Sequence, residues 1–310
     1  MCVYDEDGLC VSVCEPRNPD IEEYLGRLLI RGRKEVTTDR YRLVLNAFCR
    51  ILRSLGKNDD PRLIQEDDVY VALGAMNVSR SSQESYSYIV RQWCRFFKNY
   101  DPNCVKILTN GETPNAKWIS YSEFVTSMKA AKTKAEVLML YLGGNYGLRR
   151  GEMAKIGVED IKKGHMIIHG KGHGPQGKIR LVPLLGDTDP VIEMYMEYRR
   201  NMVQFCDVDE SDGRLLVFRQ MKVLKSYTPE YLGRRCKEIM NSAGVDGTAH
   251  SLRREFITTA YRSDAQIVDI MRIVGHTDPR QTAKYIESDL EYMRTTINLR
   301  NAYITKESMT

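Results

Sequence analysis

The chain has 310 residues and a mass of 35.7 kDa, which is long enough for two domains that each bury a core of their own. Its 46 lysines and arginines against 41 aspartates and glutamates leave a net charge of +5, which favours a nucleic-acid partner only weakly. No apolar run is long enough to cross a membrane, and none of the eight cysteines shows the C-x-x-C spacing of a zinc site. The acidic start lacks the basic and then apolar pattern of a signal peptide, so we expect a cytoplasmic protein with free thiols.

The N-terminal part of the chain is predicted to hold a tail, residues 1–18, and a helical domain, residues 19–100. The spacing of apolar residues in that domain predicts four helices. They extend from Asp20 to about Arg31, from a cap at Thr38 to a stop at Gly56, over residues 65–76, and from Ser79 or Ser81 to about Asn99.

The outward faces of these helices carry basic side chains at a density that favours contacts with DNA phosphates. They are Arg40, Arg42, Arg50, Arg53, Arg80, Arg91, Arg95 and Lys98. For any single one of them, a solvated surface charge is the alternative.

Residues 101–118 are rich in proline, glycine and asparagine and have little periodicity, which predicts a linker between two domains. The second domain is expected over residues 119–296. A C-terminal tail, residues 297–310, follows it and is a candidate for contact with a neighbouring protomer. Helical periodicity resumes near Ser122 and places Arg149 at the junction of two helices.

A β-hairpin is predicted after that junction, with strands at residues 165–169 and 178–183 around a glycine-rich turn that carries Lys171. His165, His169 and His173 recur every four residues, as metal ligands on a helix can, but the glycines among them argue against a helix.

The rest of the second domain is predicted to be largely helical. Residues 188–205 and 227–243 have helical periodicity, and residues 215–218 form a short apolar strand or connector between them. Short helices are expected from His250 onward.

Six residues of the second domain supply the groups needed to move a phosphodiester onto a tyrosine: Arg149, Lys171, His250, Arg253, His276 and Tyr285. A phenol, with a pKa near ~10, becomes a good nucleophile when a base such as histidine takes its proton. Two guanidiniums can hold the non-bridging phosphate oxygens with paired hydrogen bonds. A lysine among arginines can protonate the departing sugar oxygen.

The sequence has no motif typical of a metal-dependent nuclease or of a nucleotide-binding enzyme. The motifs include no cluster of carboxylates for paired metal ions, and no Walker-type glycine loop is present. We therefore expect neither a metal, nor ATP, nor another cofactor.

Four motifs between about residues 140 and 290 resemble those of the tyrosine recombinases, which include phage and archaeal virus integrases and Xer-type recombinases. They are GLRRGE, GKG followed by KIRLVPL, HSLRRE, and GHTDPRQTAKY. The resemblance assigns catalytic roles to the same six residues, with Tyr285 as the nucleophile. It also places Glu152 at a common acidic position beside the first arginine, as a support for the site.

The resemblance implies a mainly α-helical chain with a small β-hairpin or sheet, built as a helical core-binding domain and a mixed α/β catalytic domain. It implies a site-specific recombinase that cleaves and rejoins double-stranded DNA through a 3′-phosphotyrosyl intermediate, as a homotetramer on two DNA sites. Two departures are Arg254, where many relatives carry histidine, and Lys178, which is close enough to rival Lys171. A type IB topoisomerase and an inactive DNA-binding accessory factor are the alternatives.

Overall fold

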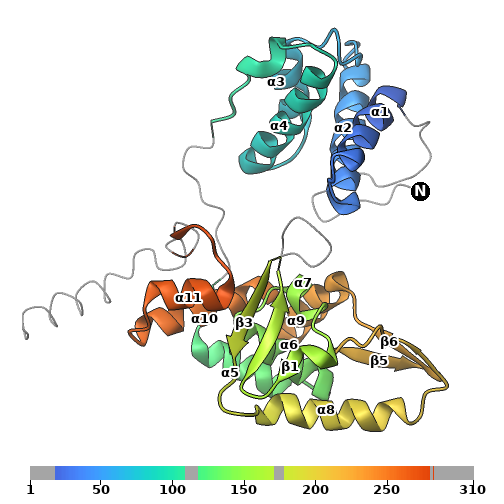
Figure 1. Cartoon of the computed structure of the whole chain (residues 1–310). Helices are drawn as coiled ribbons and strands as arrows, with labels where there is room; N and C mark the ends of the chain where they lie inside the picture. Colours follow the sequence, from blue (N-terminus) through green and yellow to red (C-terminus); the bar gives the residue numbers. More distant parts are fainter. Residues whose placement is uncertain (1–17, 109–117, 171–177, 280–281, 283–310) are drawn as a thin grey trace, which may run out of the picture. The chain divides into compact units, whose positions relative to one another are not determined.

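The computed structural model describes residues 18–108, 118–170, 178–279 and 282, and its contacts divide the chain into two compact units, Met1–Pro114 and Asn115–Thr310 (Figure 1). The predicted N-terminal tail lies almost entirely outside the described residues, as do Lys171, Tyr285 and the predicted C-terminal tail.

The first unit is a helical bundle around one apolar core. Its elements are α1 (Pro19–Ile30), α2 (Glu35–Ser54), α3 (Glu66–Ala75), α4 (Arg80–Phe96) and a 3₁₀ turn, η1 (Asp101–Cys104). Each α-helix contributes a fully buried side chain to the core: Ile21, Phe48, Leu73 and Trp93 respectively. The four predicted helices are therefore confirmed, because apolar residues at helical spacing form the faces that pack together.

Some predicted boundaries in this unit were wrong. The second helix begins at Glu35, and Thr38 is no cap: it is buried inside the helix, and its hydroxyl donates to the Glu35 carbonyl at 2.8 Å. Ser79, by contrast, caps α4 and accepts from the Ser82 backbone N–H. Val105 is fully buried in the core, so the beginning of the predicted linker packs with the first unit.

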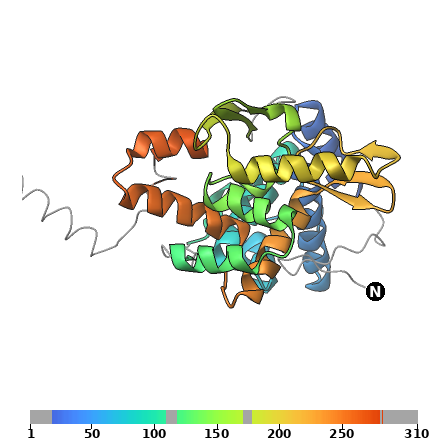
Figure 2. The same ribbon diagram turned by 90° about the horizontal axis from the view of Figure 1, so that it is seen from below.

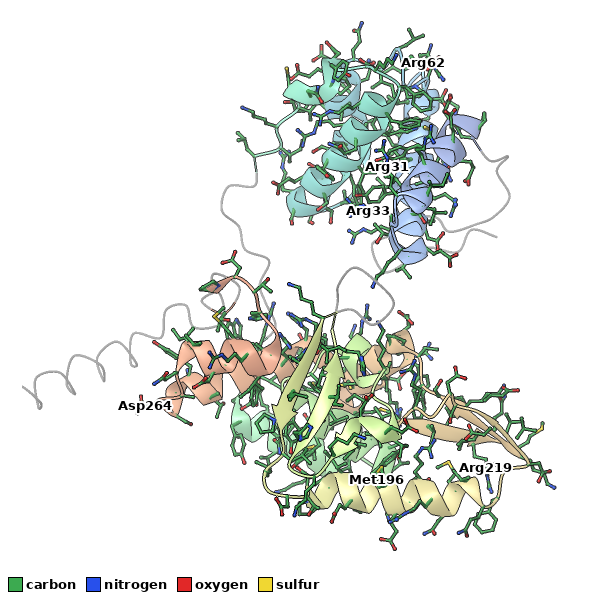
Figure 3. All side chains as sticks on the ribbon, in the orientation of Figure 1. Arg31, Arg33, Arg62, Met196, Arg219 and Asp264 are labelled. Atoms are coloured by element: carbon green, nitrogen blue, oxygen red, sulfur yellow. The ribbon has the colours of Figure 1, made fainter. Side chains whose placement is uncertain are left out.

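The basic surface of the first unit is partly neutralised within the chain. Arg42 pairs with Glu22 at 2.8 Å, and Arg53 lies 3.3 Å from an oxygen of Asp59. Arg31 and Arg33, which follow α1, are exposed in Figure 3. Phosphate contacts by this surface remain a prediction.

In the second unit, several helices pack around one central helix. They are α5 (Tyr121–Ala130), α6 (Lys134–Gly144), α7 (Arg150–Met153), α8 (Pro190–Val203), α9 (Pro229–Ser242), α10 (Ala249–Arg262) and α11 (Ile267–Val274), with a 3₁₀ turn, η2 (Val158–Asp160). Helix α6 is central: α5, α8, α9 and α10 all contact it, and its residues from Leu138 to Gly144 are buried. A Cβ added at Gly143 would lie 2.9 Å from Leu252 Cδ1, so the glycine permits α10 to approach closely.

Two small sheets complete the second unit. The first has the order β1 (Ile161–Lys162), β2 (His165–His169), β3 (Ile179–Pro183) and is antiparallel, as the predicted hairpin requires. The second has the order β4 (Val208–Glu210), β6 (Val223–Ser226), β5 (Val217–Gln220). Figures 1 and 2 show this second sheet beyond one end of α8, and α10 beside α11 at the opposite side of the unit. The prediction anticipated one strand of the second sheet and missed the other two.

Among the described residues, no helix combines the length and apolar character that crossing a membrane requires.

Candidate active site

Arg149 lies between the central helix, α6, and the short helix α7. The chain turns through Gly147, whose φ of +62° favours glycine, and Arg149 then forms the N-cap of α7. Its backbone N–H and its Nη1 both donate to Glu152, each at 2.9 Å, and Nη1 also donates to the Val274 carbonyl at 3.2 Å. The side chain keeps 31% of its surface exposed, so the guanidinium is held in one direction while part of it remains accessible.

Glu152 lies beneath Arg149 and is almost fully buried. Arg180, in β3, donates to both of its carboxylate oxygens, at 3.0 and 2.9 Å. Burial raises the pKa of Glu152, but the hydrogen bonds and charges of Arg180 and Arg149 outweigh burial and hold that pKa below its usual range. The carboxylate is thus a fixed anion between two arginines, in keeping with the supporting role expected for it.

Arg253 extends from α10 into the same cluster and is fully buried. Its Nη1 donates to the Gly147 carbonyl at 2.5 Å, and its Nη2 donates to the Val274 carbonyl at 2.7 Å. The Val274 carbonyl therefore accepts from both arginines that were predicted to clamp phosphate, Arg149 and Arg253.

His276 reaches Arg253 because of how α11 ends. Gly275 adopts φ +69°, and the backbone N–H groups of Gly275 and His276 both donate to Met271. This left-handed turn brings His276 back to the cluster, where Nε2 lies 2.9 Å from Arg253 Nη2. A guanidinium has no acceptor, so Nε2 accepts and the ring proton sits on Nδ1, which donates to the Thr282 hydroxyl at 2.9 Å.

Both predicted histidines have strongly lowered pKa values. Desolvation, followed by the charges of Arg253 and Arg149, lowers the pKa of His276 to about 4. His250, at the start of α10, is exposed to solvent, yet desolvation by the surrounding atoms and the charge of Arg254 lower its pKa to about 4 as well. Both rings are consequently neutral at pH 7 and able to accept a proton or a hydrogen bond.

A cavity of about 580 Å³ opens beside this cluster, lined among others by Arg149, Arg150, His169 and His250. His169 is not placed as a metal ligand: its Nε2 lies 3.0 Å from Asp160 Oδ1, and the described residues include no group of three or more side chains that could hold a metal. His173 lies outside the described residues.

The structure thus brings together Arg149, Arg253, His250 and His276, while Lys171 and Tyr285 lie outside the described residues. Lys178 is exposed and immediately precedes β3 at the turn end of the hairpin. The choice between Lys171 and Lys178 as the catalytic lysine stays a prediction. Arg180 was not among the predicted site residues. Its spacing is a usable signal, because Arg180 and Val182 are two residues apart in a predicted strand and so lie on the same face, and Val182 is buried.

Comparison with known proteins identifies the family. Residues 117–291, more than half of the chain, match the model of the phage integrase family. The chain belongs to the phage integrase family. Within the family it is 26% identical, over 163 residues, to the tyrosine recombinase XerC of Caldanaerobacter subterraneus, an alignment that covers 52% of this chain and 43% of that one. It is 19% identical to the tyrosine recombinase XerA of Saccharolobus solfataricus over 93% of both chains.

Solved structures of the family share the fold. A lambda integrase dimer bound to a COC′ core site superposes with a TM-score of 0.65 at 14% identity, over 86% of this chain and 75% of that one. A lambda integrase tetramer bound to a Holliday junction gives a TM-score of 0.63 at 13% identity, over 87% of this chain and 78% of that one. The predicted fold class, a two-domain, mainly helical recombinase architecture, is confirmed. The chain spans less than half the length of the XerC relative.

Proposed function

We propose that this integrase-family protein is a site-specific DNA recombinase that cleaves and rejoins DNA strands through a 3′-phosphotyrosyl intermediate on Tyr285. The observation that carries the proposal is the hydrogen-bonded cluster in which the Val274 carbonyl accepts from Arg149 and Arg253, with His276 on the second of them. Guanidiniums and a neutral histidine held in one place are what a phosphate in transfer requires.

The arginines supply the positive charge of the reaction. Arg149, which is partly exposed, would bind a non-bridging oxygen of the scissile phosphate, where charge increases in the transition state. Arg253 is fully buried in the DNA-free chain, so its binding to the phosphate requires DNA to open the cluster. His276 would assist them from its position beside Arg253. Because these cations belong to the protein, we propose a reaction that proceeds without metal or ATP.

Two proton transfers accompany the bond changes. The Tyr285 oxygen forms a bond to phosphorus as the bond from phosphorus to the 5′-oxygen breaks. His250, which is neutral at pH 7, would take part in removing the phenol proton, and Lys171 would protonate the departing 5′-oxygen. A 5′-hydroxyl of the partner DNA then attacks the phosphotyrosine, so the bond energy is conserved.

We further propose double-stranded DNA as the substrate and a homotetramer on two DNA sites as the active assembly, in the cytoplasm with the cell's DNA. The resemblance to lambda integrase, whose solved complexes include a dimer on a core site and a tetramer on a Holliday junction, supports this assembly. The C-terminal tail, residues 297–310, would provide a contact between protomers.

Trapping the covalent intermediate tests the proposal. Purified protein is mixed in EDTA with nicked DNA from its native element, quenched with SDS and examined for an adduct, with Tyr285→Phe as the control. We expect an adduct with the wild type alone. DNA binding without an adduct would instead support an accessory DNA-binding protein, and relaxation of supercoiled DNA without exchange between paired sites would support a topoisomerase.

A further inference from the structure

We propose that Arg180 is a positioning residue that fixes strands β2 and β3, which flank the segment containing Lys171, against the arginine and histidine cluster. The inference rests on the proposed function and extends it to a residue outside the six predicted ones. It follows from the bonds that Arg180 makes to separate elements of the site.

Arg180 uses all three of its guanidinium nitrogens. Nε donates to the Ile273 carbonyl of α11 at 2.6 Å, while Nη1 and Nη2 donate to the two oxygens of Glu152 in α7, at 3.0 and 2.9 Å. Only 12% of the side chain is exposed. One side chain of β3 therefore ties the hairpin both to the carboxylate that holds Arg149 and to the end of α11 that presents His276.

Two glycines show how closely the surrounding chain packs on Arg180. A Cβ added at Gly275, the turn before His276, would lie 3.0 Å from Arg180 Nη1. A Cβ added at Gly170, the last described residue before Lys171, would lie 3.6 Å from the same atom and 3.1 Å from the Lys178 carbonyl. The guanidinium thus lies between Gly170, where the chain enters the turn of the hairpin, and Gly275, where it turns toward His276.

The pairing of β2 with β3 does not by itself orient the hairpin relative to the rest of the site. Met166, Ile168 and Val182 anchor its inner face in the core. Arg180 adds a direct link to the site, because its bonds cross from β3 to α7 and α11. A lysine that must protonate one particular oxygen loses rate steeply when it is displaced, by about 100-fold for a misplacement of 1 Å.

The chemistry provides a readout specific to lysine positioning. A nicked duplex from the native element is made with either the natural 5′-oxygen or a 5′-sulfur at the scissile bond. A thiolate leaves without protonation, because thiol pKa values are far below those of alcohols, near ~8.5. A defect in the acid is therefore suppressed by the sulfur substrate, whereas a defect in phosphate binding or in the nucleophile persists.

Arg180→Lys, which keeps the positive charge but not the three-point geometry, is compared with Arg180→Gln, which keeps one amide donor. The matched control is Arg199→Lys in α8, since Arg199 is also partly buried and donates to Arg214 and Ser211, away from the cluster. Thermal unfolding and DNA affinity are measured for each variant. Wild type, Tyr285→Phe and Lys171→Ala are run in parallel.

We expect Arg180→Lys to form the adduct roughly 10- to 100-fold more slowly than wild type on the oxygen substrate and to recover most of that rate on the sulfur substrate. Lys171→Ala should show the same recovery, and Arg199→Lys should match wild type on both. Equal losses on the two substrates, or no loss in either Arg180 variant, would overturn the inference. An adduct that forms in wild type but not in Tyr285→Phe upholds the proposed function whichever way Arg180 behaves.

Discussion

Arg253 donates through Nη2 to Nε2 of His276, 2.9 Å away, and this bond decides which nitrogen of the histidine carries the proton. The other ring nitrogen then donates to the buried hydroxyl of Thr282, three residues before Tyr285. The cluster therefore fixes both the orientation and the tautomer of His276 before any DNA is bound.

The tautomer can be tested through Thr282. Thr282→Val removes the acceptor of the Nδ1 proton and leaves a buried donor without its partner, which costs about 1–3 kcal/mol. We expect nitrogen NMR of wild type to show the Nδ1-protonated form of His276, and the variant to show a mixture of tautomers and slower adduct formation. An Nε2-protonated ring in the wild type would contradict the assignment.

Acid should destabilise the second unit through its histidines. The pKa values of His250 and His276 are lowered to about 4 in the folded chain, against ~6.5 for an unperturbed histidine. As the pH falls below ~6.5 the unfolded chain takes up protons that the folded chain refuses, so stability decreases from there toward pH 4. Urea unfolding at pH 7 and pH 5 measures the loss.

His276→Gln and His250→Gln serve as the controls for that measurement. Glutamine does not titrate, so each variant should lose less stability than wild type between pH 7 and pH 5. If all three proteins lose equally, the histidines are not responsible for the acid sensitivity.

Glu152 should contribute both to the stability of the fold and to the rate of DNA cleavage. Glu152→Gln leaves two arginines with a neutral partner in a buried position, which we expect to reduce the free energy of unfolding by about 3 kcal/mol. It should also slow adduct formation at saturating DNA, because Arg149 loses its anchor. Urea unfolding and single-turnover cleavage measure the two effects.

Glu136→Gln is the matched control for Glu152. Glu136 is also buried, accepts two bonds from Arg235 and caps α6, but has no contact with the cluster. Its replacement should lower stability while leaving cleavage by the folded protein unchanged. Cleavage defects of equal size in the two variants would show that Glu152 acts through stability alone.

Gly275 should tolerate no side chain. Alanine there must adopt a φ of +69°, at about 1–2 kcal/mol, and its Cβ would press against Arg180. Gly244, after α9, has φ +74° with nothing within 4 Å of an added Cβ, so Gly244→Ala has the backbone cost alone. We expect Gly275→Ala to be the less stable variant and to slow adduct formation, whereas Gly244→Ala should cleave normally. Equal stability and cleavage in both would argue against the packing on Arg180.

The sequence predicted the helices well because the spacing of apolar residues within each segment is enough to identify a helix with one buried face. Ile21, Tyr24 and Leu25 recur at helical spacing in α1, and all lie in the first core. Leu45, Phe48 and Leu52 do the same in α2. The sequence predicted strands poorly where their formation depends on pairing with a segment distant in the chain. The three residues of the strand at 208–210 all lie at the surface and carry no apolar alternation, and the strand forms because residues 223–225 pair with it.

The site likewise contains residues that the sequence predicts and residues that only the fold reveals. Four of the six predicted residues meet in one cluster, since motif spacing marks them directly. Arg180 was missed because an arginine in a strand beside a glycine-rich turn resembles a surface charge; only the fold brings Glu152 and Ile273 to it. The backbone carbonyl of Val274, which joins Arg149 to Arg253, has no side-chain signature at all.

The carbonyls of Ile273 and Val274 receive three guanidiniums, so the negative pole of a helix serves as a counter-ion for the cationic cluster. Unlike a carboxylate, a peptide carbonyl cannot be neutralised by acid. The grip of the backbone on these arginines is therefore the same at every pH at which α11 is folded, and the pH profile of the reaction is left to its proton donors and acceptors.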